Sequence, residues 1–218
     1  MSPADFAARR AAMVATQIEA RGVCDPRVLD AMRQVPREDF VLPGWREDAC
    51  DDSPLPIEAD QTISQPYIVA FMCEALRLTG EERVLEVGTG SGYAAAVLGR
   101  LAREVHTVER IGRLADDAAA RLAGHGCANV HVHTGDGTLG WPEAAPYDAI
   151  VVTAAGPDVP AALIAQPAVG GRLVMPVGTQ FGHQELLRLT RDGEHGQRRE
   201  MLMGVRFVPL TGAQGWPG

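Results

Sequence analysis

A glycine loop at residues 86–92 has the clearest potential to do chemistry. Its sequence is Glu-Val-Gly-Thr-Gly-Ser-Gly, preceded by an apolar run at 84–87 and followed by small and apolar residues at 93–101. This pattern predicts a strand, a tight turn and a helix. Glycines let a ligand approach the backbone closely, and the first turn of a helix offers unpaired N–H groups. The loop therefore predicts a nucleotide-type cofactor at the carboxyl end of a strand.

Residue spacing limits which cofactor this loop can hold. The dinucleotide fingerprint needs a third glycine at position 93, where Tyr93 stands, and the Gly-Lys-Ser/Thr of a P-loop is absent. A carboxylate at Glu86 would repel a pyrophosphate, but it would attract the ammonium and sulfonium charges of S-adenosylmethionine. We therefore predict S-adenosyl-L-methionine as the cofactor.

Two further acidic residues follow the next apolar runs. Glu109 stands about 20 residues after Gly88, where a carboxylate can accept hydrogen bonds from both ribose hydroxyls. Asp136, within Gly135-Asp136-Gly137, could accept from an adenine amino group. Each residue alone is equally explained as a strand end or a turn former. Three such features at successive strand ends together favour a cofactor site.

The elements that position these residues alternate along the chain. Short β-branched runs at 84–87, 105–109, 130–134, 149–153 and 173–177 are separated by helical stretches. Residues 185–191 and 201–210 then alternate apolar and polar side chains across a turn at Asp192-Gly193. We predict an α/β fold with a doubly wound, mostly parallel seven-stranded sheet of the Rossmann-like type, ending in an antiparallel hairpin.

The N-terminal part is expected to be a helical extension. Residues up to about Ile18 and a segment opened by Asp25-Pro26 are predicted to be helical, and a proline-rich loop at 35–65 precedes a helix that starts at Pro66. We divide the chain into residues 1–65, with the N-terminal helices and a substrate-side loop, and residues 66–218, the cofactor-binding catalytic domain. The two parts are expected to pack as one unit.

Composition excludes several classes of partner. The formal net charge is -8 without any stretch dense in Lys and Arg, so we expect no nucleic-acid partner. We find no secretory signal and no apolar run of membrane-spanning length, and we expect a cytoplasmic monomer. The four cysteines lack Cys-x-x-Cys spacing, and His131 and His133 lack a third ligand nearby, so no metal is predicted.

Short motifs throughout the chain match one family of enzymes. The most specific is Gln61-Thr62-Ile63-Ser64-Gln65-Pro66. With the glycine loop, the others are Arg27-Val28-Leu29, Val35-Pro36-Arg37, Phe40-Val41, Pro54-Leu55-Pro56-Ile57, Val108-Glu109-Arg110, Gly135-Asp136-Gly137, Tyr147-Asp148-Ala149-Ile150, Thr153-Ala154 and Val205-Arg206-Phe207-Val208-Pro209-Leu210. Along nearly its whole length the chain resembles the protein-L-isoaspartate O-methyltransferase family.

The resemblance implies a class I methyltransferase fold and a protein-repair activity. Enzymes of this family methylate the α-carboxyl group of L-isoaspartyl residues in aged proteins, and the ester then collapses through a succinimide. The implied partners are isoaspartyl-containing proteins and peptides, and the motif serine corresponds to Ser64. Ser64 is the predicted catalytic residue, and the predicted cofactor-binding residues are Thr62, Ile63, Ser64, Glu86, Gly88, Thr89, Gly90, Ser91, Gly92, Glu109, Asp136 and Gly137.

Ser64 is expected to position the acceptor rather than attack it. A carboxylate is already ionised at neutral pH and a sulfonium is a good leaving group, so in-line positioning and desolvation suffice without a general base. The Ser64 hydroxyl would donate a hydrogen bond to the acceptor carboxylate. We also expect Ser64 to cap the helix that starts at Pro66, and Thr62 to cap or orient.

One segment departs from the family pattern. Glycines are usual around residues 57–60, where this chain carries the acidic residues Glu58 and Asp60. A carboxylate aimed at an anionic acceptor would weaken its binding. We expect both side chains to point away from the acceptor site, with Asp60 tolerating a left-handed conformation better than most residues.

Two alternatives remain open at this point. A carboxyl methyltransferase of the same fold that modifies an ordinary aspartate in a dedicated peptide, or an acidic small molecule, is kept open by Glu58 and Asp60. A non-catalytic module that binds S-adenosylmethionine would have no need for Ser64. Nucleic-acid amino methylation is disfavoured, because residues 153–157 lack Asn/Asp-Pro-Pro-Tyr. The resemblance implies that residues 205–210 help to form the peptide groove, although for Arg206 and Phe207 within this segment we expect a packing role.

Overall fold

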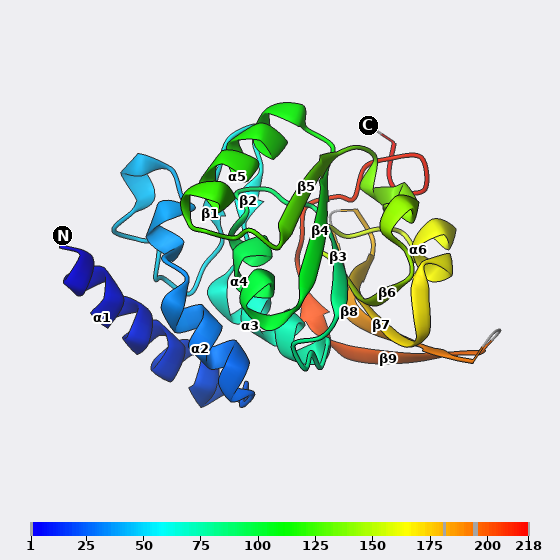
Figure 1. The fold of residues 1–218 in the computed structure, drawn as a ribbon, viewed down its shortest axis with the longest axis horizontal. Coiled ribbons are helices and arrows are strands. Elements are labelled where there is room, and N and C mark those ends of the chain that lie inside the picture. Colours follow the sequence, from blue (N-terminus) through cyan, green and yellow to red (C-terminus); the bar gives the residue numbers. More distant parts are fainter. Residues whose placement is uncertain (1, 181, 194–195, 218) are drawn as a thin grey trace.

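A seven-stranded sheet runs through the middle of the protein, with helices on its faces (Figure 1). The computed structural model describes residues 2–180, 182–193 and 196–217. The strand order is β5-β4-β3-β6-β7-β8-β9. The strands are β3 Arg83–Val87, β4 Glu104–Glu109, β5 Val130–Thr134, β6 Tyr147–Val152, β7 Pro167–Gly178, β8 Gln184–Asp192 and β9 Gly196–Val205.

Strand direction confirms the predicted architecture. All neighbours from β5 to β7 pair in parallel, whereas β8 pairs antiparallel with both β7 and β9. Alternate residues of one strand enter different cores: Val84 belongs to the core that includes the N-terminal helices, and Leu85 to the core that includes Leu163 of α6, Ala161–Ala165. A strand buried on both faces is the expected consequence of helices on both sides of a parallel sheet.

The helices begin with the signals that the sequence predicts. Asp25 caps α2 (Pro26–Gln34) by accepting a hydrogen bond from the Arg27 N–H, and Pro26 occupies the first turn. The remaining α-helices are α1 Pro3–Met13, α3 Pro66–Ala75, α4 Tyr93–Leu101 and α5 Gly112–Gly124. After α1 the chain continues as a π turn over Val14–Ile18 and a 3-10 turn over Glu19–Arg21; further 3-10 turns are Arg37–Asp39, Pro43–Trp45, Gly137–Leu139 and Pro142–Ala144.

The proline-rich segment contains a small sheet of its own. Strand β1 (Leu55–Pro56) pairs antiparallel with β2 (Thr62–Ile63), and the connecting turn holds Ala59 and Asp60 at φ 57° and 56°. The prediction that Ser64 and Thr62 cap the following helix is wrong. Gln65 is the N-cap residue of α3 and no side chain caps it. Thr62 is held in β2, and Pro66 has no N–H to be satisfied, which leaves the Ser64 hydroxyl free for another role.

The C-terminal hairpin differs from the prediction in its second strand, which starts at Gly196 and ends at Val205 rather than spanning 201–210. Beyond β9 the chain turns back to the loop after β6, where Ala155 donates to the Val208 carbonyl and Leu210 donates to the Ala155 carbonyl. Ala155 and Pro209 form an isolated parallel bridge there, outside the seven-stranded sheet. Strand β9 can start at Gly196, before the alternating pattern begins, because it is an edge strand, where polar side chains meet water.

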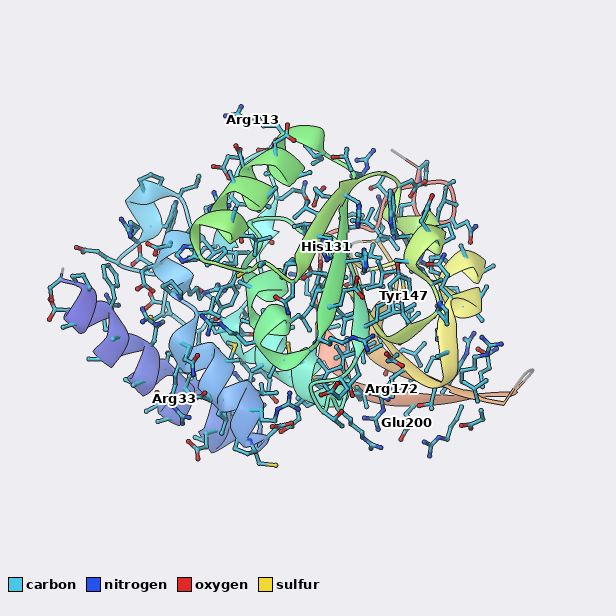
Figure 2. All side chains as sticks on the ribbon, in the orientation of Figure 1. Arg33, Arg113, His131, Tyr147, Arg172 and Glu200 are labelled. Atoms are coloured by element: carbon cyan, nitrogen blue, oxygen red, sulfur yellow. The ribbon has the colours of Figure 1, made fainter. Side chains whose placement is uncertain are left out.

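One hydrophobic core joins the N-terminal helices to the sheet. Met13, Val28 and Val84 belong to the same buried cluster, so the division at residue 65 separates two parts of one packed unit. Arg172 on β7 adds polar contacts between the sheet and the end of α3 by donating to the carbonyl oxygens of Leu76 and Arg77 (Figure 2). Among the described residues, no helix has the length and apolar character needed to cross a membrane.

Candidate methyltransferase site

The glycine loop follows β3 and is held in place by a threonine from the neighbouring strand end. Gly88, Gly90 and Gly92 have φ values of 95°, 52° and 90°. Thr153, just after β6, donates from its hydroxyl to the carbonyl oxygens of Val87 (3.0 Å) and Gly88 (2.8 Å). A Cβ atom on Gly88 would lie 2.4 Å from the Thr153 hydroxyl oxygen. Both the backbone conformation and the close contact therefore require glycine at position 88.

Two cavities adjoin this loop. The smaller, about 220 Å³, lies at the carboxyl ends of β3 and β4 and is lined by Gly88, Gly90, Glu109 and Gly137 among others. The larger, about 1090 Å³, lies beside it and is lined by Ser64 among others. They share four lining residues: Thr62, Thr153, Val208 and Pro209. A group bound in one cavity therefore lies next to a group bound in the other. We name them the cofactor cavity and the acceptor cavity.

Glu109 is placed as its predicted ribose contact requires. One carboxylate oxygen accepts from the Gly90 N–H and the other from the Ile111 N–H, both at 3.0 Å. These bonds fix the carboxylate against the glycine loop, although the side chain still lines the cofactor cavity. Each oxygen keeps a lone pair that can accept from a hydroxyl. The geometry fits a ligand with two adjacent hydroxyl groups.

Glu86 lies behind the loop rather than in the cavity. It is fully buried, accepts a 2.5 Å hydrogen bond from the Thr107 hydroxyl through Oε2, and has no partner for Oε1 among the described residues. Burial raises the pKa of Glu86 to about 8, against the opposing effect of the Thr107 hydrogen bond. A positive charge in the adjacent cavity would favour the ionised carboxylate. This unpartnered buried oxygen fits a cationic ligand.

The rest of the loop residues play supporting parts. Thr89 and Ser91 are buried and line neither cavity; the Thr89 hydroxyl lies 2.6 Å from that of Thr107, and the Ser91 carbonyl accepts from Arg121. Gly92 is the left-handed N-cap residue of α4. These three predicted cofactor-binding residues shape the loop from its buried side.

Asp136 and Gly137, which follow β5, differ in their position relative to the cofactor cavity. The Asp136 carboxylate accepts from the Thr138 N–H and hydroxyl and from the Ala213 N–H. Burial raises its pKa, but the hydrogen bonds from Ala213 and Thr138 outweigh this effect and hold the pKa below its ordinary value. Asp136 does not line the cofactor cavity, whereas Gly137 does, and a Cβ there would lie 2.4 Å from Val87 Cγ1. A contact of Asp136 with adenine stays a prediction.

The Thr-Ile-Ser motif contributes three different positions. Thr62 lines both cavities, Ser64 lines only the acceptor cavity, and Ile63 is 4% exposed in the hydrophobic core and lines neither. Among the described residues the Ser64 hydroxyl has no hydrogen-bond partner, so it is free to bind a ligand in the acceptor cavity. Of the three, Ile63 acts through packing.

The two acidic residues of the turn between β1 and β2 do not line the acceptor cavity. Glu58 lines neither cavity, and Asp60 lines the cofactor cavity. The expectation that both face away is therefore right for the acceptor cavity, but it missed the place of Asp60 beside the cofactor. The left-handed conformation foreseen for Asp60 is present, and Ala59 shares it.

Charge differs between the two cavities. Arg21, His183 and Arg206 line the acceptor cavity, and none of its described lining residues is acidic. The prediction that Arg206 and Phe207 only pack is wrong, because both border this cavity. Gln184, 2% exposed, fixes that segment by accepting from the Phe207 N–H and donating to the Phe207 carbonyl. The cavity thus suits an anionic acceptor.

Sequence reasoning missed the roles of Thr153 and Arg21. Thr153 directly follows the carboxyl end of β6. Ligands bind at the carboxyl ends of strands in a doubly wound sheet, and this rule, which predicted Glu109, also predicts Thr153. Arg21 has no comparable signal, because it reaches the acceptor cavity from the N-terminal extension. Only the packing of that extension reveals its position.

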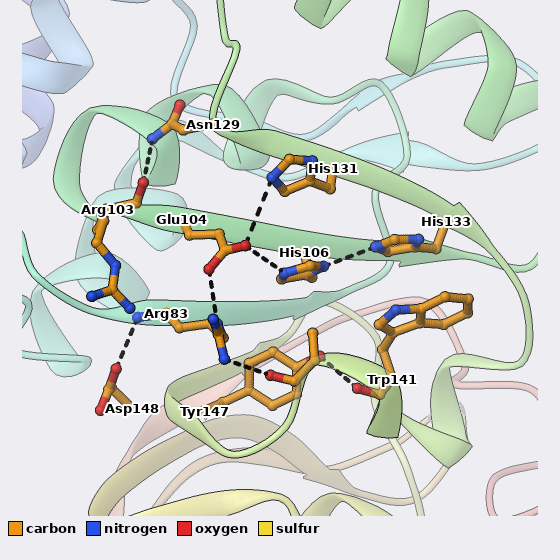
Figure 3. Close-up of polar contacts among 11 residues, drawn as sticks. Arg83, Arg103, Glu104, His106, Asn129, His131, His133, Trp141, Tyr147 and Asp148 are labelled. Carbon is orange, nitrogen blue, oxygen red and sulfur yellow. Dashed lines mark hydrogen bonds and ion pairs between the residues drawn. The ribbon is translucent and has the colours of Figure 1, made fainter.

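A histidine cluster lies on β4 and β5 (Figure 3), and none of its histidines lines either cavity. His106 Nδ1 is 2.9 Å from His133 Nε2, its Nε2 is 3.2 Å from Glu104, and His133 stacks on Trp141. Burial lowers the pKa of both His106 and His133. No metal-binding group is found among the described residues. The histidines are engaged with one another, and His131 joins them from β5.

Comparison with known proteins identifies the family. The family model for protein-L-isoaspartate(D-aspartate) O-methyltransferase matches residues 8–215. The chain is 64% identical to protein-L-isoaspartate O-methyltransferase 1 of Rhodopseudomonas palustris strain HaA2, over 97% of this chain and 86% of the relative. It is 61% identical to protein-L-isoaspartate O-methyltransferase 2 of Pelobacter propionicus, over 95% and 92%.

Solved structures agree with these relatives. One protein-L-isoaspartate O-methyltransferase structure is similar at a TM-score of 0.84 and 29% identity, covering 94% of this chain and 67% of that chain. A Plasmodium falciparum protein in complex with S-adenosyl-L-homocysteine shares the fold at a TM-score of 0.78 and 23% identity, covering 93% and 98%. The family model and the relatives at 64% and 61% identity show that the chain belongs to the protein-L-isoaspartate(D-aspartate) O-methyltransferase family.

Proposed function

We propose that this protein transfers the methyl group of S-adenosylmethionine to the free α-carboxylate of L-isoaspartyl residues in damaged proteins. The observation that carries the proposal is the pair of adjoining cavities that differ in charge. Two acidic residues, Asp60 and Glu109, and one cation, Arg110, line the cofactor cavity, whereas Arg21 and Arg206 line the acceptor cavity beside Ser64 without an acidic residue among its described lining residues. A cationic methyl donor and an anionic acceptor fit this arrangement.

Within this proposal, the cofactor cavity holds S-adenosylmethionine through three kinds of contact. Glu109 accepts from the ribose hydroxyls, the backbone at Gly88, Gly90 and Gly137 allows close approach, and Glu86 supplies negative charge from behind the loop. When bound, the cofactor supplies an electrophilic methyl group. Thr62 and Thr153 border both cavities and shape the passage between donor and acceptor.

The acceptor side needs little chemistry beyond orientation. An isoaspartyl α-carboxylate is ionised at neutral pH, so none of the residues has to remove a proton. Ser64 would donate a hydrogen bond to one carboxylate oxygen and leave the other free to accept the methyl group, with S-adenosylhomocysteine as the other product. A peptide bound in the acceptor cavity would cover the reacting atoms and exclude water from them, which would strengthen these electrostatic contacts.

The proposal includes a monomer that acts in the cytoplasm on protein substrates and not on nucleic acid or at a membrane. The net charge of -8 disfavours a nucleic-acid partner. All four cysteines are free, which fits a reducing compartment. Sedimentation analysis of the purified chain measures the oligomeric state.

Matched isoaspartyl and aspartyl peptides with methyl-labelled cofactor test the activity. We expect base-labile label in the isoaspartyl peptide and little in the aspartyl peptide. Equal labelling would favour a methyltransferase of ordinary aspartate. Cofactor binding without labelling of either peptide would favour a non-catalytic binding module.

A further inference from the structure

Arg21 brings a positive charge to the acceptor cavity from the N-terminal extension. It ends the 3-10 turn that follows α1 and lines the cavity together with Ser64 and Gln65. Neither the glycine loop nor the Thr-Ile-Ser motif accounts for a cation at this place. The surrounding contacts show how it is held.

Two neighbours orient the Arg21 guanidinium. Its central carbon lies 3.5 Å from the centre of the Tyr67 ring, and Tyr67 is itself buried on α3. Nη1 lies 3.0 Å from Asp52 Oδ2, and the Arg21 and Asp52 side chains are 41% and 37% exposed. Stacking on an aromatic face fixes the plane of a guanidinium and leaves its edges free to bind carboxylates.

The bond to Asp52 shows that a carboxylate can occupy this position. The Asp52 carbonyl accepts from the Gln65 side chain, so the ion pair lies close to the motif that contains Ser64. An exposed ion pair of this kind exchanges partners at little cost. A carboxylate carried by a peptide in the cavity can therefore take the place of Asp52.

Resting on the proposed function, we propose that Arg21 selects isoaspartyl substrates that carry an acidic side chain next to the damaged residue. The flanking carboxylate binds the guanidinium in place of Asp52, while the isoaspartyl α-carboxylate stays with Ser64. A bidentate guanidinium on the reacting carboxylate would occupy both oxygens and lower their nucleophilicity. Arg21 is thus a specificity residue that acts away from the reacting atoms.

Steady-state kinetics with two isoaspartyl peptides, identical except for a flanking Glu or Gln, test the proposal. The wild-type protein should have a KM about threefold to fivefold lower for the Glu peptide, at unchanged kcat, because an exposed ion pair adds binding in ground and transition states alike. Arg21→Gln should abolish the difference. High salt should shrink it in the wild type.

Arg33→Gln is the matched control. Arg33 lies on α2, its side chain is 40% exposed, and it pairs with Glu19 at 3.5 Å, outside both cavities (Figure 2). This variant should keep the preference for the Glu peptide. Asp52→Asn removes the competing carboxylate and should lower the KM for the Glu peptide further, in a chain that keeps Arg21.

The outcomes separate the two proposals. A wild-type protein that methylates both peptides with equal KM, or a preference that survives Arg21→Gln, overturns the role of Arg21 and leaves the methyltransferase intact. An equal fall in kcat for both peptides in Arg21→Gln also overturns it, because Arg21 would then hold the reacting carboxylate. Absence of isoaspartyl methylation by the wild-type protein contradicts the proposed function instead. If Arg21→Gln does not fold, an unchanged KM for the Glu peptide in Asp52→Asn overturns the inference.

Discussion

The cofactor cavity and the acceptor cavity adjoin, yet they are built in different ways. The cofactor cavity gathers residues from the carboxyl ends of neighbouring parallel strands; Asp60, Glu109 and Arg110 line it, and the buried Glu86 lies behind its loop. The acceptor cavity gathers the N-terminal turn, the Thr-Ile-Ser motif and the C-terminal hairpin, and it is lined by cations. The difference teaches that one fold can place a site for a cationic methyl donor beside a site for an anionic acceptor, because the two sites are built from different segments of the chain.

The largest expected effect is a loss of cofactor affinity from a substitution in the glycine loop. Gly88→Ala should weaken S-adenosylmethionine binding about 100-fold, because φ at this position is 95° and the new Cβ would lie 2.4 Å from the Thr153 hydroxyl oxygen. Isothermal titration calorimetry measures the affinity. Gly90→Ala is the control, since its Cβ would meet only Ile57 Cδ1 at 3.5 Å, and it should lose about tenfold. Equal affinity of Gly88→Ala and wild type would contradict the close packing of the loop.

The next effect is a loss of turnover from a substitution in the acceptor cavity, at unchanged cofactor affinity. Ser64→Ala should lower kcat about 10-fold to 100-fold, the effect of losing one hydrogen bond to a charged group, with cofactor affinity unchanged. Ser64→Thr keeps a hydroxyl and should recover part of the rate. Turnover and calorimetry together measure the split. A large loss of cofactor affinity in Ser64→Ala would place Ser64 in the cofactor cavity instead.

A pH experiment sharpens the electrostatic side of the comparison. Burial raises the pKa of Glu86 from 4.5 to about 8, so the folded protein holds this proton more tightly than the unfolded chain. Its contribution to the free energy of unfolding is fully present below the unfolded pKa and is lost as pH rises through the folded pKa. Glu86→Gln should remove this decline in the cofactor-free protein and should weaken cofactor binding about tenfold by removing a negative charge. Chemical denaturation across a pH series and calorimetry measure the two effects.

The histidine cluster gives an internal control for that experiment. The lowered pKa values of His106 and His133 make their contribution present above the unfolded pKa and lost as pH falls, which is the opposite direction. The decline between the unfolded pKa of 4.5 and the folded pKa of about 8 should therefore persist in His133→Asn and vanish in Glu86→Gln. A decline that is the same in Glu86→Gln and wild type would show that Glu86 does not hold the proton.

The smallest effect tests which cavity Asp60 serves. Asp60→Asn should weaken S-adenosylmethionine about threefold, as expected for a partly screened charge, and should affect S-adenosylhomocysteine less because it lacks the sulfonium. The peptide KM should not change, because Asp60 lines only the cofactor cavity. A lower peptide KM in this variant would mean that Asp60 repels the acceptor.

Sequence spacing alone determined the parallel part of the sheet and the outline of the cofactor cavity. The helix over residues 93–101 and the strand over 130–134 lie where they were predicted, and Glu109 and Gly137 line the same cavity. The physical reason is that a parallel, doubly wound sheet brings the carboxyl ends of its strands to one edge. A motif at each strand end then implies that those residues meet.

Tertiary packing decided the rest of the site. Glu86 lies behind the loop, Asp60 lines the cofactor cavity, and Arg21 and Arg206 reach the acceptor cavity from opposite ends of the chain. Local patterns report which residues favour a strand or helix, but not how a helical extension and a hairpin pack across the same sheet edge. The charge of the acceptor cavity depends on that packing, and so only the folded chain defines which substrates this enzyme prefers.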